Sequence, residues 1–337
     1  GIVPVGHGND GGGSIRIPSS ACGLFGLKPS RGRVSAHPAA TLLADPMGCP
    51  HVLARSVRDS AALLDLTAGA MPGDPYEIAR PSRPWVEEVG APPGPLRIAM
   101  VLTAPGGEVA HPECVAAVEA TAATLSELGH EVVEADPPWS VEQLMIGMSS
   151  LMATPMAVEV DARLAQLGRG LADDDLEPFS RVLYDSAAGT TGKGLVTALV
   201  ALEEMARSMG EFMIGHDLLL SPTLAQPTPP LGYLDTSNIE AMFERAATYS
   251  AFTGPFNITG QPAASLPLTV GSNGMPIGVQ LVAPFGREDR LIAVSSQVEA
   301  AHPWPVAPAW PARSEAGWPD YVESLAHTTV SGTGGER

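Results

Sequence analysis

The sequence is poor in positive charge and has almost no lysine. Its 337 residues include 19 Lys or Arg against 37 Asp or Glu, a formal net charge of −18, and the only lysines are Lys28 and Lys193. Nucleic acids and anionic membrane surfaces are bound through basic faces. The shortage of basic residues therefore argues against nucleic-acid and membrane partners.

Cysteine and long apolar runs are also scarce. Cys22, Cys49 and Cys114 are odd in number and widely spaced, which suggests neither a disulfide framework nor a zinc site, so we expect a reducing, cytoplasmic compartment. No apolar run reaches the roughly 18 residues that a membrane-spanning helix needs. Because the chain begins with Gly1 rather than Met, we expect its true N-terminus to be absent, and the lack of a signal peptide carries little weight.

Three common functional motifs are missing. Without a Gly-x-Ser-x-Gly sequence, an α/β-hydrolase is disfavoured. Without Gly-x-x-x-x-Gly-Lys-[Ser/Thr], a phosphate-binding loop is disfavoured. The eight histidines include no His-x-x-x-His pair. The sequence therefore implies no cofactor and no metal.

The composition is that of a folded globular protein, with 45% hydrophobic and 17% charged residues. Hydrophobic spacing predicts a helix over 55–69, with Ser56 and Asp59 as a capping box. A strand over 96–102, a helix over 114–128 and a strand over 131–133 predict a parallel β–α–β unit.

The rest of the chain continues this alternation, which places the fold in the α/β class. The remaining predictions, in chain order, are an irregular glycine-rich segment over 1–38, a mostly helical region over 141–216, strands over 217–223, 263–270 and 277–283, and a helix over 288–301. The final residues are expected to fray.

The most informative residue is Ser14, which follows Gly11, Gly12 and Gly13. Glycines allow successive backbone N–H groups to point at one atom, and such donors stabilise the oxyanion that forms during acyl transfer. A serine hydroxyl also needs a base. Neither His7 nor Lys28 is recognisable as that base from its spacing, and the alternative of a helix N-cap at Ser14 stays open.

This segment resembles a known family signature. Residues 1–33, from Gly-Ile-Val-Pro through Gly-Gly-Gly-Ser-Ile-Arg-Ile-Pro to Gly-Leu-Lys-Pro-Ser-Arg-Gly-Arg, are similar to the signature of the amidase signature family. Later segments resemble family landmarks in the same order, at residues 54–59, 221–223, 257–263 and 275–280. His7-Gly8-Asn9-Asp10, together with Gly286-Arg287-Glu288-Asp289, is most similar to the branch of 6-aminohexanoate-cyclic-dimer hydrolases.

The resemblance implies roles for particular residues. Ser14 corresponds to the acylating serine, and Gly11, Gly12 and Gly13 to the backbone donors of the oxyanion hole. Asp10 and Arg16 correspond to a charged pair that supports the loop, although a surface pair is the alternative reading. The family's lysine and bridging serine correspond to no residue here, so we expect them upstream of Gly1.

The resemblance further implies a fold with a large mixed β-sheet covered by helices. We expect an amidase domain over 1–304, incomplete at its N-terminus, and a tail over 305–337. The implied function is hydrolysis of a small linear or cyclic amide, without a cofactor. Assembly as a homodimer stays open. Two alternatives to an active amidase also stay open: a catalytically incomplete fragment or pseudoenzyme, and an amidotransferase subunit that acts on aminoacyl-tRNA.

Other conspicuous residues have simpler interpretations. Lys28 is expected to be structural, Lys193 a solvated loop charge and Cys22 a packed small residue. Four methionines repeat at helical spacing within the region from Leu144 to Tyr184, which contains few family motifs. These are Met145, Met148, Met152 and Met156. They are expected to be core residues or a wall of the acyl pocket.

Overall fold

The structure is a computed structural model, and it describes residues 2–38 and 40–306. The chain divides into two units, Ile2–Trp304 and a second that comprises Gly1 and Pro305–Arg337. The fold below is that of the first unit. The tail expected to fray lies, from residue 307 onward, outside the described residues.

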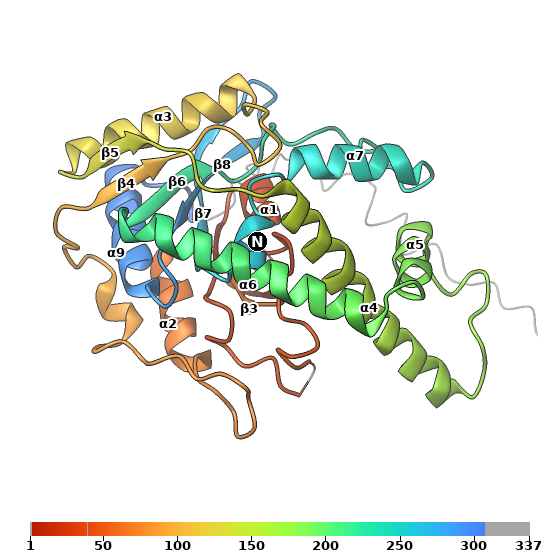
Figure 1. The fold of residues 1–337 in the computed structure, drawn as a ribbon. Helices are drawn as coiled ribbons and strands as arrows, with labels where there is room; N and C mark the ends of the chain where they lie inside the picture. The colour runs from red at the N-terminus through yellow and green to blue at the C-terminus, as the bar shows by residue number, and fades with distance from the viewer. Residues whose placement is uncertain (1, 39, 307–337) are drawn as a thin grey trace, which may run out of the picture. The chain divides into compact units, whose positions relative to one another are not determined.

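A mixed eight-stranded sheet forms the centre of this unit, in the order β1-β3-β2-β7-β8-β6-β4-β5 (Figure 1). The strands are β1 (Gly6–Asn9), β2 (Phe25–Lys28), β3 (Pro50–Ala54), β4 (Arg97–Met100), β5 (Glu131–Glu134), β6 (Leu218–Pro222), β7 (Ala263–Val270) and β8 (Pro276–Val282). The sheet is parallel from β6 through β4 to β5 and antiparallel elsewhere. The predicted α/β fold with a large mixed sheet is confirmed.

Helices surround the sheet. They are α1 (Arg16–Cys22), α2 (Val57–Thr67), α3 (Pro112–Glu127), α4 (Val141–Leu167), α5 (Pro178–Ala187), α6 (Gly192–Ile214), α7 (Ile239–Tyr249), α8 (Pro255–Thr259) and α9 (Glu288–Ala301), with a 3-10 turn, η1 (Trp85–Glu88). None of the helices within residues 2–38 and 40–306 is both long enough and apolar enough to cross a membrane.

Both faces of the sheet are covered by helices, so that alternate side chains along a strand are buried on opposite faces. Leu218 and Leu220 of β6 belong to the large core cluster, which α2, α3 and α9 complete. Leu219, between them, belongs to the opposite cluster, where α6 and α8 supply Met209, Met213 and Phe256. This is the two-residue period that a strand covered on both faces requires.

Several local predictions are confirmed. Strand β4 pairs with β5 in parallel through α3, as the β–α–β pattern indicates. In α2, the Ser56 side chain accepts a hydrogen bond from the Asp59 N–H at 3.1 Å. The predicted irregularity of residues 1–38 is wrong, because β1, α1 and β2 all lie there. These elements have four to seven residues and are held by neighbouring strands rather than by local propensity.

The most consequential of these missed elements is α1. It packs closely on β2 and β8, because Gly26 and Gly278 leave room for it. A Cβ on Gly26 would lie 2.2 Å from Ser19 Oγ, and one on Gly278 would lie 2.6 Å from Ser20 Oγ. The helix is therefore fixed against the sheet, and the loop that leads into it is fixed as well.

Candidate active site

Ser14 lies at the end of the loop between β1 and α1, two residues before the helix begins. Its side chain is exposed, whereas Ile15 and Arg16 are buried. The structure gives its hydroxyl no hydrogen-bond partner among the described residues, so it caps no helix N–H there. An exposed serine on a loop fixed by a packed helix is available to a substrate.

The backbone N–H groups of Gly11, Gly12, Gly13 and Ser14 are also available, since none has an acceptor within the described part of the chain. Of the three glycines, only Gly13 has a positive φ, at 134°. A Cβ on Gly13 would lie 2.4 Å from Thr253 Oγ1 and 2.6 Å from Ile17 Cδ1. The geometry therefore requires glycine at position 13, through both backbone conformation and contact.

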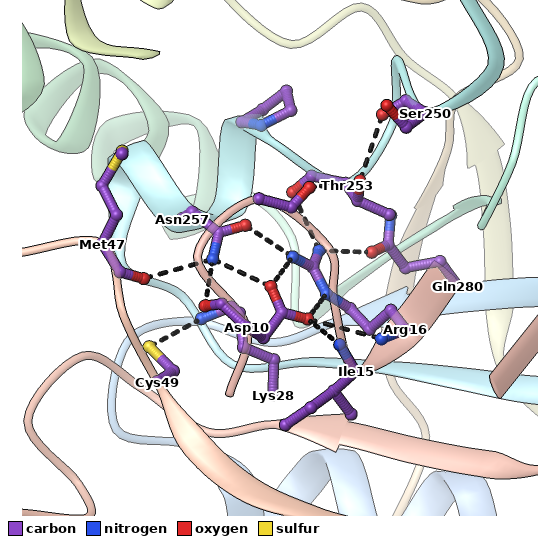
Figure 2. A network of polar contacts seen from close by, with 12 residues as sticks. Asp10, Ile15, Arg16, Lys28, Met47, Cys49, Ser250, Thr253, Asn257 and Gln280 are labelled. Atoms are coloured by element: carbon purple, nitrogen blue, oxygen red, sulfur yellow. Dashed lines mark hydrogen bonds and ion pairs between the residues drawn. The ribbon is translucent and has the colours of Figure 1, made fainter. Parts of the chain in front are cut away.

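Asp10 and Arg16 form a salt bridge of 2.9 Å, with both side chains fully buried (Figure 2). The Asp10 carboxylate accepts bonds from Arg16 Nε at 3.0 Å and Nη2 at 2.9 Å. It also accepts the N–H groups of Ile15 at 3.2 Å and Arg16 at 3.4 Å, at the start of α1. One buried carboxylate thus holds both ends of the Ser14 loop.

Three residues distant in sequence complete this network. Asn257 Oδ1 accepts a hydrogen bond from Arg16 Nη2 at 2.6 Å, and Asn257 Nδ2 donates to Asp10 Oδ1 at 2.9 Å. Arg16 Nη1 donates to Gln280 Oε1 at 2.8 Å and to the Thr253 carbonyl at 2.9 Å. All three nitrogen atoms of the buried Arg16 guanidinium therefore donate hydrogen bonds, as a buried charge requires.

The sequence reasoning assigned no role to Asn257, Thr253 or Gln280. One signal for Gln280 was present: it is the single polar side chain in the otherwise apolar strand Pro276–Val282. A buried polar residue in such a strand predicts a bonded partner. The partner's identity depends on the approach of α1 to β8, which is a tertiary feature.

This environment strongly favours the ionised form of the Asp10 carboxyl group. Burial by itself raises the pKa of the carboxyl, but the charge and hydrogen bonds of Arg16 outweigh it, so that the pKa falls to about 2. Lys28 and Asn257 act in the same direction. The carboxylate is ionised at neutral pH and functions here as a hydrogen-bond acceptor, not as an acid or base.

Lys28 and His7 do not reach the Ser14 hydroxyl through any hydrogen bond that the structure records. Lys28 is fully buried, with Nζ 2.9 Å from the Pro29 carbonyl oxygen and 3.7 Å from Cys49 Sγ. Burial lowers the pKa of Lys28 and raises the pKa of the Cys49 thiol. His7 is an exposed residue of β1, opposite Val52 of β3.

Helix α4 lies against the Ser14 loop at Met148. The Met148 Cε atom is 3.3 Å from the position of a Cβ on Gly12, and its sulfur is 3.7 Å from that position on Gly254. Of the four methionines in the helical pattern, Met145 and Met152 are exposed large hydrophobic residues. In the described residues, no group of three or more His, Cys, Asp or Glu side chains could hold a metal ion.

Comparison with known proteins supports a family assignment for this architecture. Residues 1–292 match the Amidase family. The chain is 40% identical over 315 residues to a 6-aminohexanoate-cyclic-dimer hydrolase from Paenarthrobacter ureafaciens, covering 90% of this chain and 64% of that protein. It thus spans slightly less than two thirds of the length of that relative.

Solved structures agree. A 6-aminohexanoate cyclic dimer hydrolase complexed with substrate has a TM-score of 0.84 and 38% identity, covering 90% of this chain and 65% of that one. A bacterial aryl acylamidase of the amidase signature enzymes has a TM-score of 0.76 and 26% identity, covering 90% of this chain and 63% of that one. The chain belongs to the amidase family.

Proposed function

We propose that Ser14 is the nucleophile of an amide hydrolase and that the N–H groups of residues 11–14 form its oxyanion hole. The observation that carries this proposal is the loop itself. An exposed serine follows three glycines, and the N–H groups of all four residues lack acceptors in the described structure. The buried Asp10–Arg16 pair supports that loop and takes no part in bond making.

The reaction would proceed by acyl transfer. Ser14 Oγ attacks the amide carbonyl carbon as its proton passes to a base, and the developing oxyanion accepts hydrogen bonds from the loop. The C–N bond then breaks, the amine leaves with a proton, and water hydrolyses the acyl ester. The family resemblance implies a lysine acting through a bridging serine as the base, and it assigns neither role to a residue of this chain.

The substrate class we propose is a small uncharged amide, with a cyclic aliphatic amide such as the 6-aminohexanoate cyclic dimer as the first choice. The support is the 40% identity to hydrolases of that name and the apolar Met148 beside Gly12. A tRNA substrate is disfavoured by the net charge of −18. The likeness to a glutamyl-tRNA amidotransferase subunit, at 20% identity, shows the fold alone.

We also propose a cytoplasmic location and an amidase domain over residues 1–304. The location rests on the three cysteines, which are all free in the described structure. Thiol labelling of the protein taken directly from cells and unfolded before the reagent is added tests it, because Cys49 and Cys114 are buried in the folded protein and only reduced cysteines react.

The function is tested by comparing hydrolysis of the cyclic dimer and of an aryl amide by the protein as its gene encodes it and by its Ser14→Ala variant. Loss of a nucleophile lowers kcat by roughly 10⁶-fold. Ser126→Ala, at an exposed serine of α3, is the matched control and should keep full activity. Near-native turnover by a folded Ser14→Ala variant would contradict the proposal.

A further inference from the structure

A hollow of about 350 Å³ lies between α6 and the segments that follow β2, α8 and β8. Neither Ser14 nor any other residue of its loop lines it. The lining residues are Arg31, Ala206, Gly210, Met213, Ile214, Thr259, Gln261, Pro284 and Phe285. The hollow is therefore separate from the candidate active site, and the function proposed above does not account for it.

The charge of this hollow is opposite to that of the chain. Arg31 is its only charged lining residue, although acidic residues outnumber basic ones by 37 to 19 in the sequence. No carboxylate in the described structure forms a salt bridge with Arg31. Burial lowers the pKa of the Arg31 guanidinium, only partly opposed by Cys49, Tyr76 and Asp45. A largely desolvated cation without a carboxylate at salt-bridge distance favours an anion from solution.

The guanidinium is held in place by only part of its donor set. Its Nη2 donates to the carbonyl oxygens of Asn257 at 2.7 Å and Ile258 at 2.6 Å, near the end of α8. Nη1 has no acceptor among the described residues, and Nε is buried without one. Arg31 is thus preorganised by its bonds through Nη2, and its Nη1 group is left to donate to a ligand.

The other walls are apolar. Met213 is buried, and Ile214 and Phe285 are large hydrophobic side chains with 86% and 50% of their surface exposed. An inorganic anion would leave this surface in contact with water. An anion with a hydrocarbon chain would cover it, and burial of apolar surface would add to the attraction of the charge.

We propose that this hollow binds a small aliphatic carboxylate, with its carboxylate at Arg31 and its chain along Met213, Ile214 and Phe285. The inference does not depend on Ser14 chemistry. Because hydrolysis of an aliphatic amide releases a carboxylic acid, the product of the proposed reaction falls in the same ligand class. The carbonyls held by Arg31 belong to the helix that carries Asn257, which joins the hollow to the Asp10–Arg16 network.

The test is binding of sodium hexanoate to the full protein, measured by saturation-transfer NMR titration, with hexanamide titrated in the same way and inorganic phosphate, which has no C–H protons, titrated as a competitor of hexanoate. We expect saturable hexanoate binding with a Kd on the order of 1 mM or lower. Each comparison ligand should bind at least about tenfold more weakly, since each lacks the charge or the chain. Absence of saturable hexanoate binding, or equal binding of hexanamide or phosphate, would overturn the proposal.

Two variants locate the site. Arg31→Gln keeps an N–H donor but removes the charge, and its matched control is Arg207→Gln, which removes the same charge from an exposed position on α6. Ile214→Glu places a competing carboxylate beside Arg31 at an exposed position. Its control is Leu231→Glu, at a fully exposed site outside the hollow.

We expect both Arg31→Gln and Ile214→Glu to weaken hexanoate binding at least about tenfold, while both controls keep the wild-type Kd. Should Arg31→Gln fold poorly because α8 loses two hydrogen bonds, Ile214→Glu still decides the question. Wild-type hexanoate affinity in a folded Ile214→Glu variant would overturn the assignment.

Discussion

Two hydrogen bonds join Asn257 to Asp10, although the residues are 247 positions apart in the sequence. Asn257 Nδ2 donates to the Asp10 main-chain oxygen at 2.6 Å and to its carboxylate Oδ1 at 2.9 Å. Asp10 begins the loop that carries Ser14, and Asn257 lies in α8, where its side chain contacts both Asp10 and the Arg16 guanidinium (Figure 2). The position of the candidate nucleophile therefore depends on a helix from the C-terminal part of the fold.

Asn257→Ala tests that dependence. The substitution removes the buried hydrogen bonds of the Asn257 side chain to Arg16 Nη2, to Asp10 and to the Met47 carbonyl, and we expect the free energy of unfolding to fall by about 2–4 kcal/mol. Urea unfolding measures the loss. Asn238→Ala, which removes the side-chain cap of α7, is the control and should cost only about 1 kcal/mol. Equal losses in the two variants would contradict a special role for Asn257.

Gly13 and Gly11 provide a matched pair within the loop. Gly13→Ala introduces a Cβ 2.4 Å from Thr253 Oγ1 at a positive φ, whereas a Cβ on Gly11 has nothing within 4 Å. We expect Gly13→Ala to lower the free energy of unfolding by about 1–3 kcal/mol and Gly11→Ala to change it by less than about 1 kcal/mol. Thermal unfolding of both variants measures the difference. A Gly13→Ala variant as stable as Gly11→Ala would be inconsistent with this loop geometry.

The lowered pKa of buried His51 predicts that the stability of the protein depends on pH. Burial lowers its pKa to about 4, and its Nε2 lies 3.1 Å from Ser60 Oγ. Because the unfolded chain binds this proton at an ordinary pKa of about 6.5, the contribution of His51 to stability is complete above that value and declines as the pH falls toward 4, by about 3 kcal/mol in total. The folded protein should therefore lose stability steadily over this interval.

His51→Gln should remove that part of the slope in urea unfolding between pH 7 and 4. His7→Gln, at an exposed histidine of the neighbouring strand β1, should retain it. If His51→Gln and the wild type have the same slope, the histidine is protonated in the folded protein and the reasoning is wrong.

A substitution at Met148 tests whether the acyl pocket lies beside the Ser14 loop. Its Cε reaches within 3.3 Å of a Cβ position on Gly12, so it lies beside the proposed oxyanion loop. We expect Met148→Ala to change the ratio of kcat/KM between a bulky and a small amide by about tenfold or more, since a hydrophobic pocket discriminates by roughly 1–3 kcal/mol per group. Leu167→Ala, at the exposed end of α4, should leave the ratio unchanged. An unchanged ratio in Met148→Ala would place the pocket elsewhere.

Much of the fold could be predicted because its signals are local. Ser56 and Asp59 fixed the start of α2, and apolar spacing predicted β4, α3 and β5 within a few residues. The strand Gly6–Asn9 has no apolar alternation, and α1 contains a proline and two serines. Their structure comes from pairing with β3 and packing on β8, which a local pattern does not record.

The candidate site likewise has residues that the sequence indicated and residues that only the structure brings together. The glycine run before Ser14 was visible in the sequence, and Asp10 and Arg16 were assigned as a pair through the family resemblance. Their buried partners Thr253, Asn257 and Gln280 become neighbours only when α1 lies across the sheet. The sequence does not distinguish the three glycines, whereas in the structure only Gly13 has a positive φ.

The most direct test of the central claim is to find which residue becomes acylated. The protein as its gene encodes it is treated with a fluorophosphonate, a reagent that forms a stable ester with an activated serine, and its peptides are examined by mass spectrometry. The account predicts an adduct on Ser14, parallel loss of amide hydrolysis, and no adduct on any serine in Ser14→Ala. Loss of hydrolysis with the adduct on another residue, and Ser14 unmodified, would contradict it.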